Sequence, residues 1–342
     1  MNTRIEKITD ETLAEAKEIL LSGGVVGMPT ETVYGLGGNA FDDNAVKRIF
    51  QVKGRPSDNP LIAHVHTEYD LSKLIDYDPP YAKALREAFC PGPLTLVYPS
   101  TDKVSPFVSC GLKTLAVRIP SHDGAQALLK AADIPIVAPS ANLSKHVSPT
   151  SAQHVYDDFN GKIPLILDGG KCVGGIESTV CDVTGEYPVI LRPGLVTREM
   201  IEAVVGVCGE YTPKFEKGEK VKSPGVLYKH YAPKCKTVLF DENSVENAKN
   251  AILSYCPSAL ENKGIAVLCE ENQIFNFEKM NVKCLNLGKT KAEMAQRLYG
   301  LLREAENVCE LLIVIEPREK DGIMTGVLNR LRKACGSTDI PH

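Results

Sequence analysis

The stretch KGRPSDNP at residues 53–60 places two cations, Lys53 and Arg55, one residue apart. Arg55 precedes Pro56, which disfavours helical backbone and favours an extended one, so the arginine belongs to a loop rather than to the preceding helix. A loop stiffened by two prolines holds its cations in fixed positions, and a pair of this kind can bind a polyphosphate or a carboxylate. Simple complementarity to the C-terminal end of a helix also explains Lys53.

Other polar side chains come directly after apolar runs. MPTETVYGLG (28–37) carries Thr30 and Thr32 before a glycine-rich bend, and VAPSANLS (137–144) carries Ser140 and Asn142 two positions apart, where extended backbone lets both face the same way. Open α/β sheets bind ligands at the ends of their strands, and hydroxyl and amide groups there can hydrogen bond to an anion. Turn formation is the alternative explanation for these residues.

Two ionisable residues lie within apolar segments. His64 shares a strand face with Ile62, a pattern typical of a buried core histidine. Arg118 in TLAVRIP stands at the end of an apolar strand, so it either reaches solvent or binds an anion at the edge of the sheet. Ser148 is followed by Pro149, a combination that predicts the N-cap and first position of a helix.

These residues must be positioned by an α/β or α+β fold. The helix before Lys53 is predicted to begin at Asp42 or Asp43, and further helical patterns lie near residues 11–21, 81–89, 123–132, 150–159 and 197–204. Short apolar runs alternate with them at residues 25–28, 61–65, 94–98, 114–119, 134–139, 164–168, 178–183 and 188–192. This alternation predicts a large sheet covered by helices.

The composition changes after residue 207. The segment up to residue 235 is rich in Pro, Gly and Lys and is predicted to be a linker, although SPGVLYKHYAP contains more aromatic and ionisable residues than a spacer requires. From residue 236 strand and helix patterns alternate again, which predicts a second, smaller αβ domain with an open sheet.

Composition excludes several classes of protein. The 342 residues carry a net charge of -4, so no overall field attracts nucleic acid, and the eleven scattered cysteines form no metal-ligand spacing and are expected to be reduced. The chain shows no signal-peptide pattern and no apolar run near the roughly 20 residues of a membrane span, which favours the cytoplasm. GLGGNA (35–40) matches a dinucleotide fingerprint only formally, since it lacks the acidic residue expected about 20 positions later.

Seven motifs in order resemble the YrdC-like threonylcarbamoyl-AMP synthases. They are the K-x-R of residues 53–55, the S-x-N of residues 140–142, and PTETVYGLG, CPGPLTLV, AVRIP, ESTV and LRPG. The resemblance covers residues 1 to about 205, and the SPGVLYKHYAPK linker with its trailing αβ region is similar to the long, two-domain form of the family.

The resemblance implies a fold and an activity. We expect a YrdC-like catalytic domain at residues 1–207 with a twisted mixed sheet, a linker or active-site lid at 208–235, and a Rossmann-like domain at 236–342. Members of the family condense L-threonine, bicarbonate (or CO2) and ATP into threonylcarbamoyl-AMP and pyrophosphate. A separate complex then transfers the threonylcarbamoyl group to an adenosine beside the anticodon of tRNA.

Roles follow for the candidate residues. We expect Lys53 and Arg55 to stabilise charge on the phosphates as pyrophosphate leaves. The expected threonine-binding residues are Thr30, Thr32, His64, Arg118, Ala138 and Ser178. The expected ATP-binding residues are Arg55, Asn59, Thr114, Ser140, Asn142, Ser148, Arg192 and Tyr231, the last with Lys229 and His230 beside it in the linker.

Magnesium is expected to arrive on the nucleotide, because the sequence shows no conspicuous carboxylate cluster. No stable binding of tRNA and no membrane association are expected. The main alternative function is an RNA-binding module with a basic concave surface and no catalysis, which the net charge and the absence of tryptophan disfavour. A second alternative is a carbamoyl-adenylate enzyme built on the same domain, which would carry acylphosphatase and zinc-finger segments that are not visible here.

Overall fold

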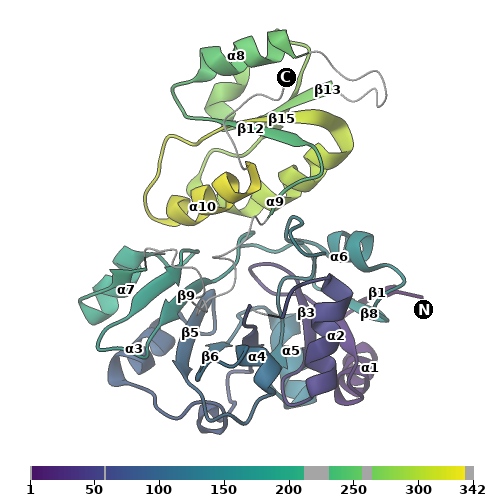
Figure 1. Cartoon of the computed structure of the whole chain (residues 1–342), viewed down its shortest axis with the longest axis vertical. Helices are drawn as coiled ribbons and strands as arrows, with labels where there is room; N and C mark the ends of the chain where they lie inside the picture. The colour runs from purple at the N-terminus through teal and green to yellow at the C-terminus, as the bar shows by residue number, and fades with distance from the viewer. Residues whose placement is uncertain (1, 58, 212–230, 256–263, 336–342) are drawn as a thin grey trace. The chain divides into compact units, whose positions relative to one another are not determined.

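A computed structural model describes residues 2–57, 59–211, 231–255 and 264–335. The chain divides into two compact units, the first formed by Met1–Ser144 and Ser148–Tyr228 and the second by Lys145–Val147 and Lys229–His342. In Figure 1 the first unit runs from purple to teal and the second from green to yellow. No helix in the described ranges is long and apolar enough to cross a membrane.

Unit 1 is built on a mixed sheet. Over the described residues this sheet has eleven strands, in the order β1-β8-β2-β3-β7-β4-β6-β5-β9-β10-β11. The sheet contains parallel pairs, such as β4 with β6, and antiparallel pairs, such as β5 with β6. The strands are β1 (Arg4–Lys7), β2 (Val25–Met28), β3 (Gly35–Asn39), β4 (Ile62–His64), β5 (Leu94–Pro99), β6 (Thr114–Arg118), β7 (Ile136–Val137), β8 (Leu165–Asp168), β9 (Thr179–Asp182), β10 (Val189–Arg192) and β11 (Gly209–Glu210).

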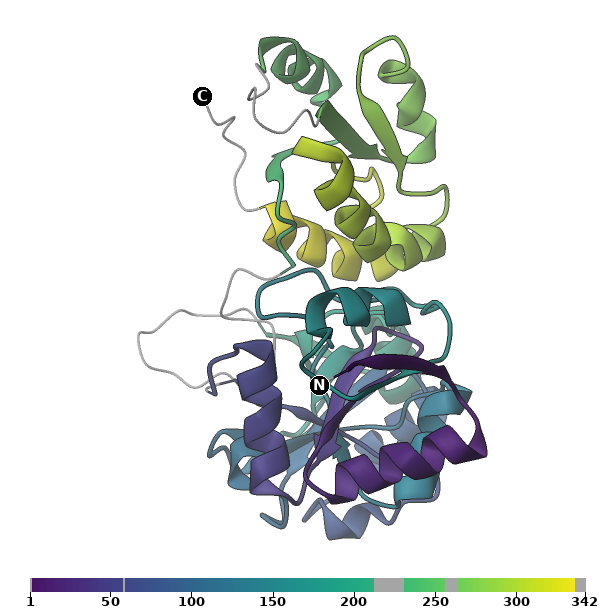
Figure 2. The same ribbon diagram turned by 90° about the vertical axis from the view of Figure 1, so that its right-hand side faces the viewer.

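Helices cover both faces of this sheet. They are α1 (Asp10–Leu21), α2 (Asp43–Lys53), η1 (Leu71–Lys73), α3 (Pro80–Phe89), α4 (Pro106–Ser109), α5 (Asp123–Ala132), α6 (Ala152–Phe159) and α7 (Arg198–Val205). Neighbouring residues of β2 belong to two separate cores. Val26 belongs to the core that includes residues of α1 and α5, two helices that lie side by side (Figure 2), whereas Val25 belongs to the core that includes residues of α2, α3 and α6. The predicted large sheet covered by helices is therefore confirmed.

The helix that delivers Lys53 begins and ends as its sequence predicts. The Asp42 side chain accepts a hydrogen bond from the Asn44 amide at 2.8 Å and caps α2, and Lys53 is the last helical residue. Gly54 follows with a φ of +61°, the left-handed conformation that ends helices, and the Arg55 amide bonds back to the Phe50 carbonyl at 3.0 Å. The chain consequently leaves the helix at a fixed angle into the cationic loop.

The predicted glycine-rich bend after Tyr34 is wrong, because residues 35–39 form strand β3 between β2 and β7. The glycines make close pairing possible: a Cβ on Gly35 would lie 2.9 Å from the Cβ of Ala138. Glycine often indicates a turn, but in this segment the absence of side chains allows two strands to approach each other.

The predicted cap of the helix at residues 150–159 is also wrong. Ser151, not Ser148, caps α6, and its side chain accepts from the His154 amide. The carbonyl of Pro149 accepts a hydrogen bond from the Tyr34 amide at 2.9 Å, and that of Thr150 accepts one from a residue in another loop. These long-range bonds keep residues 149 and 150 out of the helix.

Unit 2 contains a parallel sheet of four strands, as far as the described residues extend, in the order β12-β15-β13-β14. The elements are β12 (Lys236–Phe240), α8 (Val245–Ser254), β13 (Gly264–Cys269), η2 (Glu271–Asn276), β14 (Lys283–Asn286), α9 (Lys291–Val308), β15 (Cys309–Ile315) and α10 (Ile323–Cys335). This is the small open αβ sheet that the sequence predicts.

Candidate active site

A row of polar residues crosses three adjacent strands of unit 1. Arg118 ends β6, and its register partners are His64 on parallel β4 and Thr95 on antiparallel β5. His64 and Arg118 both stand at the carboxyl ends of their strands, and all three residues are buried. The sheet therefore brings together three residues that are 23 to 54 positions apart in sequence, by the differences of their residue numbers.

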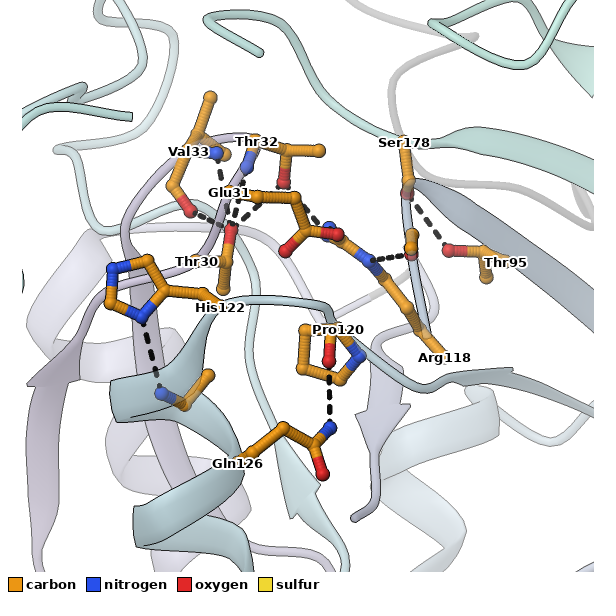
Figure 3. Close-up of polar contacts among 12 residues, drawn as sticks. Thr30, Glu31, Thr32, Val33, Thr95, Arg118, Pro120, His122, Gln126 and Ser178 are labelled. Carbon is orange, nitrogen blue, oxygen red and sulfur yellow. Dashed lines mark hydrogen bonds and ion pairs between the residues drawn. The ribbon is translucent and has the colours of Figure 1, made fainter. Parts of the chain in front are cut away.

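The loop after β2 fixes the guanidinium of Arg118 (Figure 3). Nη1 donates to the Thr32 hydroxyl at 2.8 Å, Nη2 lies 2.7 Å from a carboxylate oxygen of Glu31, and Nε donates to the Gly92 carbonyl at 3.4 Å. Arg118 is only 4% exposed. Burial alone would raise the pKa of Glu31, but the charge and hydrogen bond of Arg118 lower it below its ordinary value. The pair is thus a buried ion pair.

Thr30 organises this same loop. Its hydroxyl accepts from the amides of Thr32 and Val33 at 3.1 and 3.2 Å and donates to the Val33 carbonyl at 2.6 Å. The two threonine hydroxyls lie 2.9 Å apart. The predicted pair Thr30 and Thr32 therefore lies in one hydrogen-bonded network with Arg118.

His64 is buried and neutral. Its Nδ1 lies 3.2 Å from the Ile62 carbonyl. Burial first, and the neighbouring charge of Arg118 second, lower the pKa of His64 to about 3. Such an imidazole offers a hydrogen-bonding group without adding a second cation beside the arginine.

The imidazole resonances of His64 are expected to keep their neutral chemical shifts from pH 8 down to pH 5. An unfolded histidine binds a proton near pH 6.5, while the folded one stays neutral to about pH 3. Stability from this group is therefore complete above pH 6.5 and is lost as the pH falls toward 3, by about 1.4 kcal/mol per pH unit. NMR titration of histidine-labelled protein, assigned with His64→Gln, measures this, and a midpoint near 6.5 would contradict the neutral assignment.

Lys53 and its neighbours form a second cluster. The Lys53 ammonium contacts the carbonyl oxygens of Ser140 and of Asn142, the latter at 2.6 Å, and the side chain is 3% exposed. Burial, and then the positive charge of Arg55, hold the pKa of Lys53 well below its ordinary value. Arg55 donates to the Asn59 carbonyl at 3.2 Å, which closes the loop. All five predicted residues of this group thus lie together.

Ser178 and Arg192 connect to the row through Thr95. The hydroxyls of Ser178 and Thr95 lie 2.8 Å apart, and Arg192 donates to the carbonyl of Ser178 at 3.0 and 3.2 Å and to its hydroxyl at 3.2 Å. Gly194 permits this arrangement, because a Cβ there would come within 2.4 Å of the Thr179 amide.

The remaining predicted residues of unit 1, Ser148, Ala138 and Thr114, lie in three different segments of the chain. Ser148 is fully buried and donates to the Glu177 carboxylate at 2.7 Å, and the Ala138 amide donates to the Ile62 carbonyl at 3.1 Å. Thr114 lies at the opposite end of β6 from the arginine.

Tyr231 belongs to unit 2, where its ring lies 5.3 Å from that of Tyr299. Lys229 and His230 fall outside the described residues, as does most of the predicted lid.

Sequence reasoning gave no role to three residues that complete the site: Glu31, Thr95 and Glu177. Glu31 stands between the two predicted threonines, and Thr95 is a small polar residue within the apolar run LTLVY. Glu177 is the first residue of ESTV, and all three residues lie within motifs that carry the family resemblance, which is the signal that could have identified them.

The arrangement suits chemistry on anionic substrates. Two buried basic groups lie in this site: Arg118 is held by the Thr32 hydroxyl and the Glu31 carboxylate, and Lys53 is held by backbone carbonyls. Such preorganised groups stabilise negative charge without reorganisation. Fold and site together define an α/β enzyme for group transfer between anions.

Comparison with known proteins identifies the family. The family described as "Telomere recombination", which groups Sua5, YciO and YrdC, matches residues 18–194, and "Threonylcarbamoyl-AMP synthase, C-terminal domain" matches residues 196–336. Threonylcarbamoyl-AMP synthase of Pyrococcus abyssi is 40% identical over 97% of this chain and 96% of its own length. That of Bacillus subtilis is 40% identical over 96% and 94%.

Solved structures agree with the sequence matches. The structure of Pyrococcus abyssi Sua5 complexed with L-threonine is 38% identical, with a TM-score of 0.85, and covers 98% of this chain and 97% of its own. The chain belongs to the long, two-domain threonylcarbamoyl-AMP synthases. It is an enzyme of the nucleotidyltransferase type, and the alternative of a non-catalytic RNA-binding module is wrong.

Proposed function

We propose that unit 1 joins L-threonine, bicarbonate or CO2, and ATP into threonylcarbamoyl-AMP and pyrophosphate at the site described above. The threonine amine adds to carbon dioxide and loses a proton, giving a carbamate. A carbamate oxygen then attacks the α-phosphorus of ATP, a new P–O bond forms, and the bond to the β-phosphate oxygen breaks to release pyrophosphate. The observation that carries this proposal is the buried arginine of the row, fixed by Thr32 and Glu31 beside a neutral imidazole.

Arg118 binds the carboxylate of threonine or of its carbamate in this proposal. The relative solved with L-threonine supports the choice of amino acid. The side-chain hydroxyl of threonine needs polar partners, since a site built to hydrogen bond a hydroxyl discriminates strongly against analogues that lack it. The groups proposed to contact the amino acid are Thr30, Thr32, His64, Ala138 and Ser178.

Lys53 and Arg55 act on the phosphates. A nearby anion favours the charged form of a lysine, so the arrival of a triphosphate raises the lowered pKa of Lys53 toward its ordinary value. The lysine then stabilises the charge that develops as pyrophosphate leaves. The further nucleotide contacts are proposed, from the resemblance, to be Asn59, Thr114, Ser140, Asn142, Ser148, Arg192 and Tyr231.

Magnesium is proposed to accompany ATP rather than to be held by the protein. Across the described part of the chain, no group of three His, Cys, Asp or Glu side chains is placed to hold a metal ion. When bound, magnesium supplies charge neutralisation on the phosphates. The protein side chains position the carbamate.

The product is proposed to serve tRNA threonylcarbamoyladenosine formation in the cytoplasm. A separate threonylcarbamoyl-transferase complex receives the product and carries out the transfer beside the anticodon. The net charge of -4 supports the absence of stable tRNA binding by the synthase itself.

Pyrophosphate release from ATP is expected to require L-threonine and bicarbonate together, because neither alone provides the attacking carbamate oxygen. A coupled pyrophosphate assay with all four combinations of the two substrates measures this. L-Serine, which lacks the threonine methyl group, serves as the matched control and should react more slowly. Equal release without any amino acid would refute the proposed reaction.

A further inference from the structure

Unit 2 contains a cavity of about 490 Å³ at the carboxyl ends of its parallel strands. Glu270, directly after β13, Lys289, between β14 and α9, and Arg318, after β15, all line it. Its volume lies within the range of small-molecule sites, roughly 300–1,000 Å³. The synthase reaction proposed for unit 1 assigns it no role.

The topology of the sheet makes this edge a ligand-binding position. Strands β13 and β15 are neighbours, but the chain leaves them in opposite directions: after β13 it leads through η2 to β14, and after β15 it leads to α10, which packs beside β12. The Thr237 hydroxyl on β12 donates to the carbonyl of Cys335 in α10 at 2.9 Å. Open α/β sheets bind ligands in the crevice at such a topological switch point, outside the carboxyl ends of the strands.

Among the described residues, two cations at the cavity have no carboxylate as an ion-pair partner. Neither the Lys289 ammonium nor the Arg318 guanidinium forms an ion pair with any residue that the structure describes. The third cation of the lining, Lys291, is paired with Asp321 at 2.6 Å and Glu319 at 2.8 Å. The unpaired charges therefore come from two different loops that meet at the switch point.

The loop before α9 lies tightly on the first turn of that helix. Gly288 has a φ of +121°, and a Cβ there would lie 2.8 Å from the Cβ of Glu293, so a side chain would push the loop away. Thr290 caps the helix, which is eighteen residues long and points the positive end of its dipole toward the loop. The Glu293 carboxylate accepts from the amides of Lys289 and Thr290 at 2.8 and 3.1 Å and completes the capping box, so the preference of the cavity for negative charge rests on the cations Lys289 and Arg318.

The Glu270 carboxylate gives the cavity a hydrogen-bond acceptor. Its side chain is 5% exposed, and one carboxylate oxygen accepts a hydrogen bond from the Arg318 amide at 2.9 Å. A buried carboxylate does not suit a second phosphate, but it suits hydroxyl groups such as those of a ribose. The lining consequently combines an anion-binding part with a hydroxyl-binding part.

We propose that this cavity binds a phosphate-bearing small molecule of the size of a nucleoside monophosphate. The phosphate lies against Lys289 and Arg318, and the hydroxyl groups of the ligand donate to Glu270. This second site is separate from the substrate site in unit 1 and is formed by residues of unit 2.

Methyl NMR on the full chain tests the proposal, because two of its six methionines, Met294 and Met324, line the cavity. Titration with AMP is expected to shift both methyl resonances saturably, whereas Met280 of the same unit stays unchanged. Met28, beside the predicted threonine-binding loop, reports any binding in unit 1 separately. Inorganic phosphate should shift the two cavity methionines only at concentrations at least about tenfold higher, and adenosine should not saturate.

The variant K289S/R318S should weaken the AMP response of Met294 and Met324 at least about tenfold. The variant K236S/K279S removes the same charge from exposed positions outside the lining and should leave the response unchanged. Single R318S should give an intermediate loss. Unchanged cavity methionines at millimolar AMP, saturation by adenosine at the same concentration as AMP, or saturation by inorganic phosphate at the same concentration as AMP would each overturn the proposal.

Discussion

Replacing Lys53 by methionine is expected to lower the rate of pyrophosphate release roughly 10²–10³-fold, equivalent to about 3–4 kcal/mol of transition-state stabilisation. The ammonium is buried at the end of α2, close enough to Arg55 for the charge of the arginine to lower the pKa of the lysine. Methionine keeps most of the aliphatic stem and removes only the charge. The measurement is turnover at saturating L-threonine, bicarbonate and ATP.

Structural damage must be separated from lost catalysis, because the same ammonium holds the carbonyls of Ser140 and Asn142. Arg48→Met removes an exposed charge from the same helix and should retain full turnover and thermal stability. If Lys53→Met lowered the unfolding temperature but left turnover intact, Lys53 would be a structural tie between two loops rather than a catalytic residue.

Local patterns predict much of the fold. The eight apolar runs correspond to β2 and to β4 through β10, and the predicted helices correspond to α1, α2, α3, α5, α6 and α7. Strands β1 and β3 were missed for physical reasons: β1 is short and partly exposed, and β3 contains three glycines that pack because they lack side chains. A strand that is rich in glycine, because its neighbours approach closely, lacks the apolar side chains from which a strand is predicted.

Long-range partners were harder to predict than the site residues themselves. The position of Arg118 at the end of an apolar strand indicated an anion site, but nothing near it in sequence identifies Glu31, 87 positions earlier by the difference of their numbers. Likewise, Ser148 has the local sequence of a cap, yet it donates to Glu177. Glu31, Ser148 and Glu177 lie in loops, and which loops meet depends on how the strands that carry them are ordered in the whole sheet.

Arg118→Met is expected to abolish detectable threonine binding and also to destabilise unit 1. Removing one partner of a buried ion pair leaves the Glu31 carboxylate uncompensated, which typically costs about 3–5 kcal/mol. Loss of a cation that binds a substrate carboxylate costs about 2–5 kcal/mol of binding free energy, or at least roughly 30-fold in affinity. Calorimetric titration with L-threonine and urea unfolding measure the two effects separately.

The double variant E31Q/R118M distinguishes the two roles of the arginine. Removing both charges relieves the unpaired carboxylate, so the unfolding free energy should recover most of the loss, whereas threonine affinity should not recover. Glu31→Gln alone keeps the guanidinium and its bond to Thr32, so it should lose stability but retain measurable threonine binding. In the proposed site, the Glu31 carboxylate and the substrate carboxylate compete for the same guanidinium. If a stable double variant still bound threonine with full affinity, Arg118 would not belong to the substrate site and would have only a structural role.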